Sequence, residues 1–162
     1  MTTLHFICGK AASGKTTLAR GLAARHAAVL FGEDEWLTLL DVEIDSLADH
    51  VRHSKRLKAA LAPLAVRLLQ LRVPVVFDFA GNTPNDRAWV RSIFKSADYL
   101  VASDESCKAR LHLRNEIEPE GLYFGFVSED RFDEVTRYFI PPSDQENFHV
   151  IYHEADAPSP KG

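Results

Sequence analysis

The stretch from Gly9 to Thr16 constrains this chain more than any other part of it. It reads Gly-Lys-Ala-Ala-Ser-Gly-Lys-Thr and fits the pattern G-x-x-x-x-G-K-[ST] at every defined position. An apolar run, Leu4 to Cys8, leads into it, and leucine spacing predicts a helix over residues 16–26. A strand, a glycine-rich turn and a helix in this order direct backbone N–H groups and a helix dipole toward one anion. The alternative is a glycine-rich turn that arose by chance, and both flanks argue against it.

The pattern predicts a loop that binds the phosphates of a nucleoside triphosphate. Gly9 and Gly14 permit the tight turn, Lys15 reaches the β- and γ-phosphates, and the Thr16 hydroxyl is a ligand for Mg²⁺. We therefore expect ATP and Mg²⁺ as cofactors. The residues expected to bind the nucleotide are Gly9, Lys10, Ala11, Ala12, Ser13, Gly14, Lys15, Thr16 and Thr17.

Short apolar runs alternate with helical patterns along the chain, which predicts an α/β fold with a parallel sheet. The runs of strand length are Leu4–Cys8, Ala28–Phe31, Val73–Phe77, Tyr99–Ala102 and Phe148–Tyr152. Thr83, Pro84 and Asp86 form a capping-box pattern, so a helix is expected to start there. Pro63 interrupts a leucine stripe and predicts either a kink or the first turn of a new helix.

The second half of the chain is expected to carry a lid. Residues 103–115 and 128–139 have helical patterns, and Pro141 and Pro142 end the second of them. Residues 116–127, with Pro119 and two glycines, read as a loop or lid tip. We expect one domain over residues 1–154, followed by a flexible tail over residues 155–162 that is rich in proline and small residues.

Three acids follow the second expected strand. Glu33, Asp34 and Glu35 lie where the chain leaves the carboxyl edge of the sheet, which is the usual ligand site of open α/β folds. A carboxylate there can accept the proton of an attacking hydroxyl. We favour Asp34 as this base, with Glu33 and Glu35 as solvated neighbours; the alternative is an acidic helix N-terminus. Trp36 either lines the substrate site or fills the core.

The third expected strand also ends in an acid. Asp78 follows Val75 to Phe77 and is the second candidate for holding Mg²⁺, beside Thr16. An aspartate that caps a turn is the alternative. Asp78 to Gly81 also spells D-x-x-G, a pattern of GTPase switches, but the chain has no N-K-x-D sequence for guanine, so a GTPase is not favoured.

Arg110 and Arg114 are four residues apart and share one face of an expected helix. Two guanidinium groups there can stabilise the charge that develops on a transferred phosphoryl group, and an ordinary solvated basic face is the alternative. Arg131 and Arg137 on the next helix are weaker candidates for the same role. The basic segment Arg52 to Lys58 follows an acidic stretch and is interpreted as a solvated helix face.

Composition narrows the possible partners. The 162-residue chain has 19 basic and 23 acidic residues and a formal charge of −4, which does not favour nucleic acid as a partner. Cys8 and Cys107 lie in unrelated segments, and the seven histidines show no ligand spacing, so both thiols are expected to be reduced and no metal besides Mg²⁺ is expected. No signal peptide or membrane span is found, and the expected location is the cytoplasm.

These features together resemble a known group. The loop from Gly9 to Thr16, Asp34 after Gly32, the strand ending at Asp78, the pair Arg110 and Arg114, and residues 141–148 are similar to the small P-loop kinases grouped with zeta toxin, chloramphenicol phosphotransferase and the polynucleotide 5′-kinase domain. Many of these chains are labelled AAA-type ATPases.

The resemblance implies a three-layer P-loop NTPase fold with a five-stranded parallel sheet and a helical lid. It also implies phosphate and Mg²⁺ roles for Lys15 and Thr16, a base role for Asp34, and lid roles for Arg110 and Arg114. Polynucleotide kinases carry an arginine shortly after their catalytic aspartate, whereas this chain has Trp36 and Leu37 there.

We therefore expect an ATP-dependent phosphotransferase that moves the γ-phosphate to a hydroxyl of a small acceptor, in a monomer or homodimer that does not bind membranes. A regulatory P-loop ATPase and a nucleic-acid 5′-hydroxyl kinase are the alternatives. An AAA-type ring is least favoured, since 162 residues leave no room for a separate helical domain.

Overall fold

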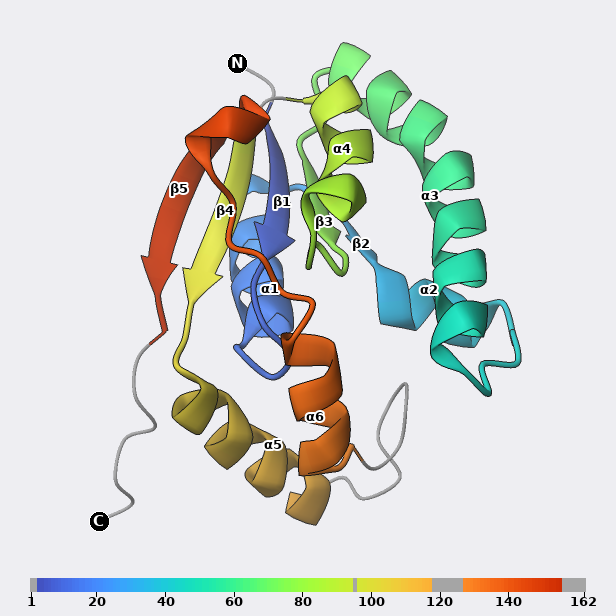
Figure 1. Cartoon of the computed structure of the whole chain (residues 1–162). Helices are drawn as coiled ribbons and strands as arrows, with labels where there is room; N and C mark the ends of the chain where they lie inside the picture. Colours follow the sequence, from blue (N-terminus) through green and yellow to red (C-terminus); the bar gives the residue numbers. More distant parts are fainter. Residues whose placement is uncertain (1–2, 95, 118–126, 156–162) are drawn as a thin grey trace.

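The computed structural model describes residues 3–94, 96–117 and 127–155 and has an α/β fold built on one sheet (Figure 1). Five parallel strands lie in the order β2-β3-β1-β4-β5. The strands are β1 (Leu4–Cys8), β2 (Val29–Gly32), β3 (Val75–Asp78), β4 (Ser96–Val101) and β5 (His149–Glu154). The expected five-stranded parallel sheet is confirmed: β1 has the expected bounds, and those of the other four strands differ by one to three residues from the expected ones.

The sheet brings the ends of its first three strands to one level. Ile7 on β1 and Gly32 on β2 are both paired with Asp78 on β3. Because β1 is central and the strand order reverses beside it, the loops after these strands meet at the carboxyl edge of the sheet, where open α/β folds bind ligands.

Helices cover both faces of the sheet and its carboxyl edge (Figure 1). Residues of α1 pack with Ile7 and Val76 on one face, and residues of α3 and α4 pack with Phe6 and Phe77 on the other. The next two helices, α5 and α6, lie beyond the strand ends (Figure 1). The helices are α1 (Lys15–His26), α2 (Glu33–Leu39), α3 (Leu47–Gln70), α4 (Pro84–Ile93), α5 (Asp104–Ile117) and α6 (Glu129–Thr136), with a short 3₁₀ helix, η1 (Asp144–Glu146).

The core under α3 and α4 is aromatic. Phe77 lies 5.5 Å from Phe31, 5.3 Å from Phe79 and 5.0 Å from Trp89, measured between ring centroids. Trp36 packs against the same cluster, 6.1 Å from Phe31, so it belongs to the edge of the core. This cluster fixes the end of β3 and the start of α4, and these two elements carry the loop that contains Gly81.

Helix α3 runs through Pro63 without a break in its assignment, so the alternative of a new helix at this proline is wrong. Pro63 and Ala59 are both exposed, and the Ala59 carbonyl is the group that loses its usual helical donor to the proline ring. The capping box of Thr83 and Asp86 at the start of α4 is confirmed. Helix α6 ends at Thr136, three residues before the expected end.

A buried ion pair ties the chain after α6 to α4. The guanidinium of Arg87, which is fully buried, donates to both carboxylate oxygens of Glu146 at 2.8 and 2.6 Å. It also donates to the carbonyls of Gly81 and Ile140, at 2.7 and 2.8 Å. One side chain therefore holds together α4, the loop after β3 and the segment that leads to β5.

Both cysteines are buried, and neither forms a disulfide bond. Among the described residues, no helix combines the length and the apolar character that crossing a bilayer requires. The expected lid tip and tail fall largely on residues 118–126 and 156–162, outside the described residues.

Candidate active site

The loop between β1 and α1 has the backbone shape that its glycines allow. Gly9 has φ of +155° and Gly14 has φ of +102°. A Cβ at Gly9 would lie 2.9 Å from both the Leu100 carbonyl oxygen and the Ser13 hydroxyl, so no larger residue fits there. Helix α1 begins at Lys15, directly after Gly14, and its first N–H groups face the loop. The loop therefore has the form of an anion-binding cradle.

Lys15 is held across this loop. Its ammonium donates to the carbonyls of Gly9 and Lys10, at 3.0 and 2.7 Å. Loss of hydration lowers the pKa of Lys15, and the negative charges of Asp78 and Asp34 oppose that effect. The cation thus lies near both acids at the carboxyl edge of the sheet.

Thr16 and Asp78 are in direct contact. The Thr16 hydroxyl donates to an Asp78 carboxylate oxygen at 2.6 Å, which joins the first turn of α1 to the end of β3. A hydroxyl and a carboxylate are oxygen ligands of the kind Mg²⁺ prefers, and this ion commonly takes one or two carboxylates together with phosphate oxygens. The pair fits that role. In the described part of the chain, no group of three or more histidines, cysteines or acids is placed to bind a metal.

Asp34 lies in the first turn of α2, which starts where β2 ends. Its side chain is accessible to solvent, yet it is set among protein atoms at the strand ends. The resulting loss of hydration, with the charges of Glu33 and Asp78, raises the pKa of Asp34 to about 7, while Lys15 and Arg114 act to lower it. A carboxyl group with this pKa can exchange a proton near neutral pH.

Glu33 is not the solvated neighbour that the sequence analysis expected. Its side chain is 3% exposed. One carboxylate oxygen accepts from the Ser54 hydroxyl on α3, and the other accepts from the Ala80 N–H at 2.8 Å. The Lys58 ammonium lies 4.0 Å away. The expectation was wrong because these partners lie far away in sequence, while Glu35, the third acid, is exposed as expected.

Helix α5 approaches the phosphate loop from the other side. Arg110 donates to the Ser13 carbonyl at 2.8 Å, and Arg114, one turn later and exposed, is close enough to lower the pKa of Asp34. Lys10 pairs with Asp104 at 2.5 Å. Ala11 and Ala12 pack against a cluster of Cys107, Leu111 and Phe132 from α5 and α6. The two lid helices are therefore docked on the loop itself.

The remaining candidates have other surroundings. Arg131 pairs with Glu134 at 2.6 Å, and Arg137 and Thr17 are exposed. The basic segment of residues 52–58 is only partly the solvated face that was expected, because Ser54 and Leu57 are buried and Lys58 lies over the Trp89 ring, 5.9 Å from its centroid.

The comparisons with known proteins agree with this geometry. A family model described as an AAA domain matches residues 4–142, most of the chain. The chain belongs to this AAA domain family. No sequence among the curated proteins matches the AAA domain chain.

Several solved structures share the fold of this AAA domain. A sugar kinase from Janibacter sp. HTCC2649 has a TM-score of 0.67 and 17% identity, over 96% of this chain and 86% of that one. A gluconokinase from Sinorhizobium meliloti 1021 has a TM-score of 0.66 and 13% identity, over 97% and 84%. Kti12 from Chaetomium thermophilum, in complex with ADP-AlF3, has a TM-score of 0.65 and 16% identity, over 96% and 91%. The AAA domain thus has the P-loop NTPase fold seen in small kinases.

The sequence analysis missed the residues that hold the site together. Ser54 is the only buried polar member of a charged segment, and Arg87 and Glu146 are 59 residues apart. No local pattern marks either position as buried. Glu146 has one signal, since Ser143 and Glu146 form a capping box in which the Glu146 carboxylate accepts from the Ser143 N–H.

Proposed function

We propose that this AAA domain is an ATP-dependent phosphotransferase that moves the γ-phosphate to a hydroxyl group of a small molecule. The observation that carries the proposal is the meeting of three groups at one edge of the sheet: the phosphate loop with Lys15, the Thr16–Asp78 pair, and Asp34. A nucleotide-binding loop alone serves many functions. Transfer to a hydroxyl needs in addition a nearby group that can accept its proton, and Asp34, whose pKa is raised to about 7, fits that need.

Each side chain has a role in the proposed reaction. The loop N–H groups and Lys15 bind the β- and γ-phosphates, and Arg110 and Arg114 stabilise negative charge on the transferred group. Asp34 orients the acceptor hydroxyl and takes its proton as the oxygen attacks phosphorus in line with the leaving ADP. Thr16 and Asp78 would hold Mg²⁺, which when bound neutralises charge on the phosphates.

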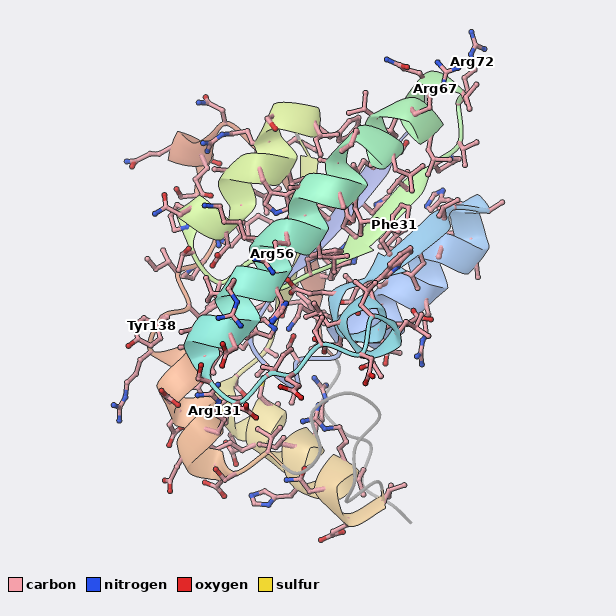
Figure 2. All side chains as sticks on the ribbon, turned by 90° about the vertical axis from the view of Figure 1, so that its right-hand side faces the viewer. Phe31, Arg56, Arg67, Arg72, Arg131 and Tyr138 are labelled. Atoms are coloured by element: carbon pink, nitrogen blue, oxygen red, sulfur yellow. The ribbon has the colours of Figure 1, made fainter. Side chains whose placement is uncertain are left out.

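The likeness to sugar kinase and gluconokinase structures supports a small acceptor, because these proteins share the fold over nearly the whole chain. The charge pattern supports it too. Arg56 and Arg67 lie on α3, Arg72 follows the end of that helix (Figure 2), and Lys58 turns toward Glu33. The formal charge of −4 likewise does not favour a nucleic-acid backbone as the partner.

The test is a transfer assay with γ-labelled ATP and Mg²⁺. The purified chain is incubated with separate pools of sugars, sugar nucleotides, nucleosides, aminoglycosides, chloramphenicol-like compounds and 5′-hydroxyl oligonucleotides. We expect label in one of the small-molecule pools. Asp34→Asn should reduce that transfer by roughly 10²–10⁴, the range for loss of a positioned base, and retain ATP binding. Lys15→Ala should abolish turnover.

Glu35→Gln is the matched control, because Glu35 is an exposed acid in the same turn as Asp34. It should transfer label at the rate of the unmodified chain. Label that appears only as free phosphate, at equal rates in Asp34→Asn and the unmodified chain, would favour the regulatory ATPase instead. Label in the oligonucleotide pool alone would favour the 5′-hydroxyl kinase.

A further inference from the structure

Helix α2, which carries Asp34, is not anchored by its own ends. It has seven residues, its N-cap is Gly32, and no side chain caps its first turn. A helix this short is not stable by itself, so its position depends on contacts with the rest of the fold. The placement of Asp34 therefore requires another group to fix the first turn.

The Glu33 carboxylate supplies that contact. Through its two oxygens it joins the start of α2 to Ser54 in the first half of α3 and to the Ala80 N–H in the loop after β3. Glu33 and Ser54 are 2% and 4% exposed, so water does not compete for these hydrogen bonds. The Lys58 ammonium, 4.0 Å from the carboxylate, offsets the cost of burying its charge.

The Glu33 carboxylate and the Ala80 N–H form a bridge, and each of these two residues lies close in sequence to one of the two acids of the proposed reaction. Glu33 precedes Asp34 directly, and Ala80 comes two residues after Asp78. The bridge therefore sets the position of Asp34 relative to the Thr16–Asp78 pair and the phosphate loop. Since Glu33 has both oxygens occupied and is buried, it is not available to take a proton from an acceptor.

We propose that Glu33, together with Ser54, is a positioning residue that holds Asp34 in place for phosphoryl transfer. The inference rests on the proposed function of Asp34. A shift of about 1 Å in a reacting group can reduce a rate 10²-fold, so Glu33→Ala should lower kcat for label transfer by about that factor. The KM for ATP and the affinity for a fluorescent ATP analogue should stay unchanged, since the hydrogen bonds and ion pair of Glu33 go to Ser54, Ala80 and Lys58 and not to the phosphate loop.

Glu33→Gln tests whether the hydrogen bonds of Glu33 or its negative charge matter for transfer. The glutamine carbonyl can accept from the Ala80 N–H while its amide donates to the Ser54 hydroxyl, so both links can remain. This variant should keep most of the transfer rate. Ser54→Ala, which removes one link, should show a smaller loss than Glu33→Ala. If Glu33→Ala does not fold, as judged by circular dichroism, Ser54→Ala takes its place in the tests below.

The deciding experiment combines Glu33→Ala with Asp34→Asn, using the compound pool that accepts label from the unmodified chain. If Glu33 acts only through Asp34, its removal should have little further effect on the transfer rate once Asp34 is replaced. The double variant should therefore transfer label at a rate within about threefold of that of Asp34→Asn alone. The same further loss in both backgrounds, or a loss confined to ATP affinity, would overturn the positioning role while leaving the proposed function intact. Absence of transfer in the unmodified chain, or full transfer by Asp34→Asn, would overturn the proposed function and this inference with it.

Discussion

At the scale of single residues, consecutive acids in one helical turn have opposite surroundings. Asp34 is open to solvent at the edge of the sheet and has a pKa of about 7, whereas Glu33 is buried and hydrogen bonded on both oxygens. The first arrangement suits an exchange of protons, and the second suits a fixed structural charge. In the proposed reaction, Asp34 therefore takes the proton and Glu33 holds Asp34 in place.

The raised pKa of Asp34 predicts how transfer depends on pH. A base acts only when it is ionised, so kcat/KM for label transfer should rise with pH and pass its midpoint near 7. Rates measured between about pH 5.5 and 8.5 check this. In Asp34→Asn the residual rate should lack this rising limb, and a flat profile in the unmodified chain would exclude Asp34 as the titrating base.

The same pKa predicts how Asp34 affects stability. Its folded-state value of about 7 lies above the ordinary 3.8, so between these pH values the folded chain retains a proton that the unfolded chain has released. The contribution of this group to the free energy of unfolding therefore falls as pH rises through that window. Asp34→Asn should melt at nearly the same temperature as the unmodified chain near pH 4, close to the unfolded-state pKa, and at a higher temperature near pH 8, about a unit above the folded-state pKa. An equal melting difference at both pH values would contradict the raised pKa.

Local patterns predict the phosphate loop and Asp34 but not their supports. Gly9 to Thr16 form a contiguous motif whose geometry depends on its own glycines, and the chain order alone places Asp34 after β2. Glu33 could not be predicted, because its two hydrogen-bond partners lie 21 and 47 residues away and neighbouring acids look alike in the sequence. Contacts that form only after long-range folding leave no short-range pattern.

At the scale of elements, helix starts could be predicted better than helix ends. The capping box of Thr83 and Asp86 is a local hydrogen-bonding pattern that marks the start of α4 correctly. The end of α6 could not be predicted as well: the helix ends at Thr136, three residues before the expected end, although Pro141 and Pro142 come later. Pro63 shows the limit of a local rule. A proline at an exposed position of a long packed helix removes one backbone hydrogen bond, while the buried residues of that helix pack against the core and hold it in place.

The Thr83 cap provides a test at this scale. The Thr83 hydroxyl accepts from the Asp86 N–H, and the Asp86 carboxylate accepts from the Thr83 N–H. Thr83→Ala should lower the free energy of unfolding by about 1 kcal/mol, measured by urea denaturation. Asn85→Ala, an exposed change in the same first turn, should alter it by less than about 0.5 kcal/mol. Equal effects of the two changes would show that the box does not stabilise α4.

At the scale of the whole molecule, the carboxyl edge of the sheet is bounded by groups that cross-link distant elements. Glu33 joins α2, α3 and the loop after β3; Arg110 joins α5 to the phosphate loop; and Arg87 joins the loop after β3 to the segment that follows α6. The same loop, residues 79–82, takes part in two of these links. Buried and half-buried polar contacts thus fix the loops of the candidate site. The aromatic cluster around Phe77 packs under the end of β3 and the start of α4.

Substitutions of Arg87 and Glu146 test this arrangement most strongly. Both side chains are buried, so removing one leaves the charge of the other poorly hydrated. Arg87→Met leaves the Glu146 carboxylate buried without its partner, which should lower the free energy of unfolding by about 3–5 kcal/mol near neutral pH. The double variant Arg87→Met with Glu146→Leu removes both charges and should recover part of that loss. Urea denaturation of the two variants and the unmodified chain measures both effects, and a double variant no more stable than Arg87→Met would contradict the pairing.

The pair also predicts the response of the fold to acid. Burial alone raises the pKa of Glu146, but its hydrogen bonds with Arg87 and the charge of that arginine outweigh burial and hold the pKa below the ordinary 4.5. The unfolded chain therefore takes up a proton at this group before the folded chain does, so its stabilisation is complete above 4.5 and is lost as pH falls through the folded-state value. The melting temperature of the unmodified chain should drop across this acid range. In Glu146→Gln, which carries no titrating group here, the drop should be smaller, and identical acid profiles would show that another carboxylate controls the transition.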